Sequence, residues 1–133
     1  MDMIRQMDMS YSYKPVLMKA ILLYADDKGR IKLENIVAYF RSYYEGRRAA
    51  NLVVEKRNSI FAKGGYTDKE AERNILSNPF KRFEDMQMLR HTKTLGVVQV
   101  DESVWKKLTK GEKAEIEQIC DEKLERYFRN MKA

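Results

Sequence analysis

The segment from Pro15 to Tyr24 constrains the fold more than any other, because it is apolar on nearly every side. Its apolar residues recur at the i, i+3, i+4, i+7 spacing of an α-helix; they are Leu17, Ala20, Ile21 and Tyr24, with Val16 and Leu23 on the flanks. A helix without a polar face is stable only when other elements surround it. We therefore predict that this segment is the central helix of the core. Pro15 suits its first turn, where the missing N–H leaves no hydrogen bond unmade.

Five further segments carry a start signal or an apolar face that is typical of a helix. Two of them begin with a capping box, a Thr followed three residues later by a Glu, and one begins with an Asn-Pro pair. The helices are expected from Glu34 to Arg48, from Thr67, from Asn78, from Asp101, and from Thr109 to the end of an apolar stripe at Met131.

β structure is expected at two places. The stretch from Leu95 to Val100 is rich in β-branched residues, and we predict a hairpin from Met88 to Val100 with its turn near Lys93. The segment from Arg30 to Leu33 alternates polar and apolar residues like a very short strand. We therefore predict a mainly α (α+β) fold, a small helical domain with a short β-hairpin. The order of elements matches a winged helix, in which a brief strand after the first helix pairs with a two-stranded wing.

The length of 133 residues fits one domain that buries a core without disulfides or a metal. Residues 1–12 have weak periodicity, and we expect a flexible N-terminal segment over residues 1–10 followed by a single helical domain over residues 11–133. The lone cysteine, Cys120, rules out an intrachain disulfide and favours a reducing compartment. The apolar run from Val16 to Tyr24 is too short to span a membrane, and the N-terminus lacks the pattern of a signal peptide. We expect a cytoplasmic protein with no membrane partner.

Positive charge is confined to the middle of the chain. Residues 1–40 carry 6 basic and 5 acidic side chains, residues 41–110 carry 15 and 9, and residues 111–133 carry 5 and 6. The middle segment alone therefore accounts for the net charge of +6. Concentrated positive charge favours polyanions such as nucleic acid, although a net charge of this size is also ordinary for a solvated surface.

The sequence lacks the residues that catalysis and metal binding require. His91 and Cys120 are too few for a structural zinc site, which takes four Cys or His ligands. No nucleophile elbow, phosphate-binding loop or dinucleotide fingerprint occurs. Acidic pairs such as Asp26-Asp27 stand at expected helix ends, where capping explains them. We therefore expect no enzyme activity, no cofactor and no metal.

Two groups of residues are candidates for binding nucleic acid. Aromatic residues and arginines interleave between Tyr39 and Arg48, and a second basic group lies near the expected hairpin. Arginine forks pair with phosphates, and tyrosine rings stack on bases. The candidates are Arg41, Tyr43, Arg47, Arg48, Lys81, Arg82, Arg90, His91 and Lys93. In the alternative interpretation the tyrosines border the core and the arginines pair with Glu45 and Glu55.

Five segments share a pattern with a known module: Tyr11 to Leu17, Gly29 to Ile31, Tyr39 to Arg47, Val54 to Lys56, and Asn78 to Phe83. They resemble an accessory module at the C-terminal end of bacterial superfamily 2 helicases and restriction-type defence proteins, over about residues 10–130. The sequence has no helicase motor motif, so the resemblance implies an accessory domain and transfers no catalytic residue. It also implies either a fragment of a larger protein or a stand-alone relative, such as a phage or mobile-element protein.

Two functions remain open at this point. The first is a non-catalytic accessory domain that binds nucleic acid, with DNA as the expected form, in a DNA-processing or defence system. The second is a docking module that binds a nuclease, a helicase or another defence partner, because Tyr and Arg also anchor protein interfaces. Convergence of the basic candidates on one face would favour nucleic acid, and their scatter would favour docking.

Overall fold

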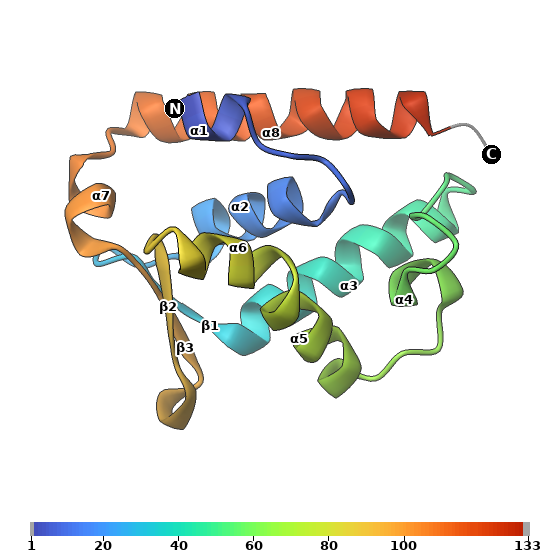
Figure 1. Ribbon diagram of the computed structural model, residues 1–133, viewed down its shortest axis with the longest axis horizontal. Coiled ribbons are helices and arrows are strands. Elements are labelled where there is room, and N and C mark those ends of the chain that lie inside the picture. Colours follow the sequence, from blue (N-terminus) through green and yellow to red (C-terminus); the bar gives the residue numbers. More distant parts are fainter. Residues whose placement is uncertain (1, 132–133) are drawn as a thin grey trace.

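The computed structural model describes residues 2–131, and helix α2 (Tyr13–Tyr24) lies at its centre. Two long helices pack against it, α3 (Leu33–Ala49) on one side and α8 (Lys110–Asn130) on the other (Figure 1). The side chains of Val16 and Leu17 are completely buried. The prediction of a central apolar helix is confirmed. The helix begins two residues before Pro15, which keeps the proline in its first turn.

A three-stranded antiparallel sheet lies at one end of the helices (Figure 1). Its strands are β1 (Arg30–Lys32), β2 (Leu89–Thr92) and β3 (Val97–Val100), in the spatial order β1-β3-β2. Strands β2 and β3 form the predicted hairpin, and its turn contains the 3-10 helix η1 (Lys93–Leu95). Strand β1 pairs with β3. The chain is therefore mainly α with a short hairpin, and its elements follow the order expected for a winged helix.

Three short helices connect α3 to the hairpin: α4 (Ile60–Lys63), α5 (Asp68–Ser77) and α6 (Pro79–Asp85). The predicted capping box begins α5, where the Thr67 hydroxyl accepts a hydrogen bond from the Glu70 N–H at 3.1 Å. Asn78 was expected to cap α6, and this prediction is wrong, because its side chain makes no capping hydrogen bond. Asn78 is the single residue between the two helices, and its N–H ends α5 by donating to the Asn74 carbonyl at 3.1 Å.

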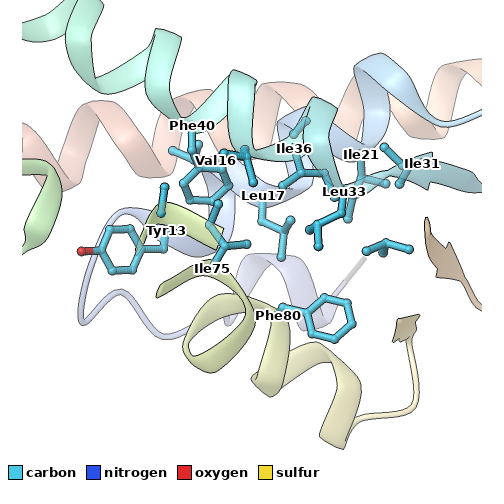
Figure 2. Close-up of a cluster of buried hydrophobic side chains, with 14 of the residues drawn as sticks. Tyr13, Val16, Leu17, Ile21, Ile31, Leu33, Ile36, Phe40, Ile75 and Phe80 are labelled. Atoms are coloured by element: carbon cyan, nitrogen blue, oxygen red, sulfur yellow. The ribbon is translucent and has the colours of Figure 1, made fainter. Parts of the chain in front are cut away.

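The core joins side chains from α2, α3, β1, α5 and α6. Figure 2 shows Val16, Leu17 and Ile21 facing Ile31, Ile36, Phe40, Ile75 and Phe80. Next to this cluster, α4 inserts Phe61, whose ring stacks on Tyr44 with the centroids 4.7 Å apart. Both aromatic side chains are completely buried, so the aromatic positions of α3 at Phe40 and Tyr44 serve the core, as their helical spacing indicated.

The last helix is held by a second, smaller cluster. Helix α1 (Asp2–Arg5) places Ile4 against Ile116, Ile119 and Cys120 of α8. Within the segment expected to be flexible, Ile4 is therefore buried; the flexibility itself stays a prediction. Helix α7 (Glu102–Lys107) connects β3 to α8, which begins with the predicted capping box of Thr109 and Glu112. In the range 2–131, no helix has the length and apolar character to cross a membrane.

Candidate nucleic-acid interface

The outer face of the sheet carries basic side chains in register. Antiparallel pairing places Arg30, Gln99 and Arg90 in one row across the three strands, and Lys32, Val97 and Thr92 in another. Arg30, Lys32 and Arg90 are exposed, whereas Ile31 and Val98, which alternate with them, are buried. Successive residues of a strand point to opposite faces, so the apolar residues face the core and the basic ones face solvent.

The turn of the hairpin lies beside β1. Gly96 has the left-handed conformation (φ +61°) that glycine adopts without strain, and its carbonyl accepts a hydrogen bond from the Leu33 N–H at 2.9 Å. This bond brings Lys32, the residue before Leu33, next to the turn. Lys93 is exposed there, and Leu95 is 73% exposed. The basic face therefore continues from the strands to the end of the hairpin.

The strands and their turn contain no carboxylate. Acidic residues do adjoin them: Glu84, Asp101 and Glu102 line a hollow with Arg90 and Gln99. Asp26, before β1, and Asp101, after β3, have local hydrogen-bond partners. The N–H groups of Arg30 and Lys28, each 2.9 Å from an Asp26 oxygen, hold the pKa of Asp26 below its usual value. The hydroxyl of Ser103, 2.6 Å from Asp101, lowers the pKa of that carboxyl in the same way. Both acids therefore stay ionised as turn and capping residues.

Three cations of this surface form no ion pair with any residue that the structure describes: Lys32, Arg90 and Lys93. Arg30 contacts Asp26 at 3.4 Å, a long separation for an exposed pair. Such pairs contribute little to stability. We call Arg30, Lys32, Arg90 and Lys93 the basic sheet face.

His91 does not lie on the basic sheet face. It stands in the same row as Ile31 and Val98 and is half-buried. Its ring meets Phe80 edge-on, with the centroids 6.1 Å apart. The structure therefore separates His91, a predicted nucleic-acid contact, from the exposed cations, because strand alternation turns its ring towards the helices.

Two of the predicted arginines of α3 bind to neighbouring elements. Arg41 pairs with Asp68 at the start of α5. Arg48 pairs with Glu45 at 3.0 Å and donates to the carbonyls of Phe61 and Ala62, which belong to α4. These contacts fasten α5 and α4 to α3, and they use three of the N–H donors of Arg48 but only one of Arg41.

The third arginine and its tyrosine neighbour lie between α3 and α8. The Arg47 guanidinium stacks 3.5 Å from the centroid of the Phe128 ring and donates to the Val53 carbonyl at 2.6 Å. Tyr43 is half-buried with its ring edge-on to Tyr44, and burial raises the pKa of its hydroxyl. The pairing expected in the alternative interpretation holds for Arg48 with Glu45, whereas Glu55 binds no arginine.

Lys81 and Arg82 lie on α6, away from the other candidates. Lys81 pairs with Asp85 at 2.9 Å within its own helix. Both residues border a polar hollow of about 350 Å³ that also contains Asp8 and Asp85. Lys14 lies in the same lining, so three cations and two acids share this surface and only one positive charge is in excess.

The structure thus brings Arg90 and Lys93 together and leaves the remaining predicted candidates on α3, on α6 or beneath the sheet. Sequence reasoning missed Arg30 and Lys32, although their alternation with Ile31 in an expected strand indicated that both point outwards. In the part of the chain that the structure describes, no three His, Cys, Asp or Glu side chains form a group able to hold a metal ion. No protein-family model matches the chain, and neither does any curated protein or solved structure.

Proposed function

We propose that this chain is a non-catalytic accessory domain that binds the phosphate backbone of nucleic acid, with DNA as the expected form, through the basic sheet face. The observation that carries the proposal is the set of four cations, Arg30, Lys32, Arg90 and Lys93, on strands and a turn without a carboxylate. Cations that neutralise phosphates release condensed counterions, which provides most of the affinity in backbone recognition.

The shape of the surface supports the same function. The hairpin projects away from the helices (Figure 1), with Lys93 and Leu95 exposed at its end. The winged-helix order of elements and the resemblance to accessory modules of helicases and restriction-type proteins agree with this proposal. The helices that precede the hairpin carry balanced charge: residues 68–85 contain 4 basic and 5 acidic side chains. We therefore assign the contact to the sheet and not to a helix.

Fluorescence anisotropy with single- and double-stranded oligonucleotides at two salt concentrations tests the proposal. The variant is Lys32→Gln/Arg90→Gln/Lys93→Gln. The control is Lys63→Gln/Lys69→Gln/Arg73→Gln, which removes the same charge from exposed residues outside the sheet. Each lost phosphate contact makes the log–log salt slope shallower by roughly one unit.

We expect the sheet variant to bind more weakly with a shallower slope, and the control to bind like the wild type. Equal losses in both variants would mean that only total charge matters and would overturn the assignment to the sheet. Absence of wild-type binding at low salt would overturn the nucleic-acid function and leave the docking hypothesis.

A further inference from the structure

A second basic surface, separate from the sheet, lies at the C-terminal half of α8. It is an open hollow of about 440 Å³ between α8 and residues that precede α2 or follow α3. Its lining includes Met9, Lys56, Lys123, Arg126, Tyr127 and Asn130. The four α8 residues in this list are spaced i, i+3, i+4, i+7 and therefore share one helix face. Three lining residues are cations, and none of the described lining residues is acidic.

Backbone contacts hold two of the cations at the hollow. The Lys56 ammonium donates to the Ser10 carbonyl at 2.5 Å and lies 5.0 Å from the centroid of the Tyr11 ring. The Lys123 ammonium donates to the Met7 carbonyl at 3.5 Å. An ammonium has three donors, so each lysine keeps donors for a ligand.

Arg126 is exposed, and its guanidinium forms no hydrogen bond or ion pair with the described residues. Arg129, one turn further along α8, instead pairs with Glu125 at 2.9 Å. The five donors of Arg126 are therefore available at the rim of the hollow. Arg129 is thus held by a carboxylate, whereas Arg126 has its guanidinium available to bind an anion.

The buried carboxylate beneath the hollow forms no ion pair with these three cations, and its single negative charge offsets only one of them. Glu55 is 6% exposed and accepts hydrogen bonds from the N–H groups of Ser12 and Lys56, from the Ser12 hydroxyl and from the Tyr127 hydroxyl. Neutral donors thus satisfy its oxygens, and neither Lys123 nor Arg126 pairs with it. The hollow therefore keeps a net positive charge that a ligand from solvent can meet.

We propose that this hollow binds a phosphate group, with Arg126 as the bidentate contact and Lys56 and Lys123 as point charges. A guanidinium fork matches two phosphate oxygens, and ammonium groups add attraction without demanding one geometry. Asn130 adds an amide donor at the same rim. The volume also admits the remainder of a small phosphorylated molecule. In Figure 1 the hairpin lies at the left and the C-terminal end of α8 at the right, so this site is independent of the basic sheet face.

Isothermal titration calorimetry with pyrophosphate tests the site in the wild type and in Lys123→Gln/Arg126→Gln. The control is Lys107→Gln/Lys110→Gln, which removes two exposed lysines around the start of α8. We expect saturable 1:1 binding that the site variant weakens at least about tenfold, since each lost bond is charge-assisted. The control should bind like the wild type, and circular dichroism should show that both variants stay folded.

Competition experiments with the wild type identify the source of the phosphate. Displacement of pyrophosphate by a 5′-phosphorylated dinucleotide but not by AMP would assign the site to a nucleic-acid end, whereas displacement by AMP would assign it to a free nucleotide. Either result supports the phosphate site. No saturable pyrophosphate binding, or equal weakening in the site variant and the control, would show that these cations only complement the C-terminal end of α8, and would overturn the proposal.

Discussion

Tyr127 donates its phenolic hydrogen to the buried carboxylate of Glu55, a residue 72 positions earlier in the chain. The same carboxylate accepts the Ser12 N–H at 2.8 Å, and the Ser12 hydroxyl lies 2.6 Å from the Tyr44 hydroxyl. The start of α2, the end of α3, the loop after it and the end of α8 therefore meet at one acidic group. A buried charge is tolerated only when hydrogen bonds replace its hydration, so Glu55 depends on all these segments being in place.

The first prediction concerns this network. Tyr127→Phe should lower the free energy of unfolding by about 1.5 kcal/mol, because a hydrogen bond to a buried charge is lost and no volume changes. Urea denaturation measures the effect. The control is Tyr24→Phe, since the Tyr24 ring is 44% exposed and this substitution removes only a hydroxyl. An equal loss of stability in both variants would show that the hydrogen bond from Tyr127 to Glu55 does not stabilise the protein.

The second prediction concerns the turn that positions β1. Gly29 has φ +79°, and a Cβ atom there would lie 2.9 Å from Cγ of Trp105. Gly29→Ala should therefore destabilise the protein by about 1–3 kcal/mol, from backbone strain and a contact with a rigid ring. Gly46→Ala is the matched control, because it lies inside α3 with open space around it.

The control should change stability in the opposite direction, by about 0.5–1 kcal/mol, since alanine favours the helix. The melting temperature of each variant, monitored by circular dichroism, shows whether the substitution stabilises or destabilises the protein. Two shifts of the same sign would contradict the left-handed turn at Gly29.

The third prediction concerns Arg47, which was expected to contact nucleic acid. Arg47→Ala should lower the free energy of unfolding by about 1–2 kcal/mol, because it removes the stacking on Phe128 and the bond to the Val53 carbonyl. Arg57→Ala, at an exposed position of the loop that follows α3, should have little effect. Anisotropy on the folded variants should show equal oligonucleotide affinity. Weaker binding by the Arg47 variant alone would place the interface on α3.

The fourth prediction concerns the thiol of Cys120. Burial raises the pKa of Cys120 to about 12 from an ordinary value near 9. The folded protein should therefore react with a thiol reagent at pH 8 far more slowly than the denatured chain, because the thiolate is the nucleophile. Absorbance of the released chromophore measures the rate.

The same shift affects stability at high pH. The Cys120 thiol holds its proton more tightly in the folded state than in the unfolded state. The stability that this thiol contributes is therefore complete below about pH 9 and is lost as the pH rises to about 12. Cys120→Ala should make the decline of stability across this range shallower. An unchanged decline would contradict the burial of the thiol.

Elements whose signals are local were predicted well. The capping boxes at Thr67 and Thr109 need only a Thr and a Glu three residues apart, and the central helix needs only apolar spacing around Leu17. Helix α4 was missed because four residues are too few to show a period. Its start depends on the Ser59 hydroxyl, which accepts the Phe61 N–H at 3.2 Å, and its stability depends on burying Phe61.

The sequence by itself determined where the longer helices and the strands occur and which of their faces are apolar, because both follow from residues within one or two turns of each other. Only the tertiary structure decided which cations have partners inside the protein. Arg47 and Lys93 are both basic residues next to aromatic or β-rich segments, yet Arg47 is occupied by Phe128 from α8, and Lys93 has no ion-pair partner among the described residues. The side chains of Arg and Lys bind whichever groups the packing of distant segments brings close to them. Spacing along the chain does not show which groups these are.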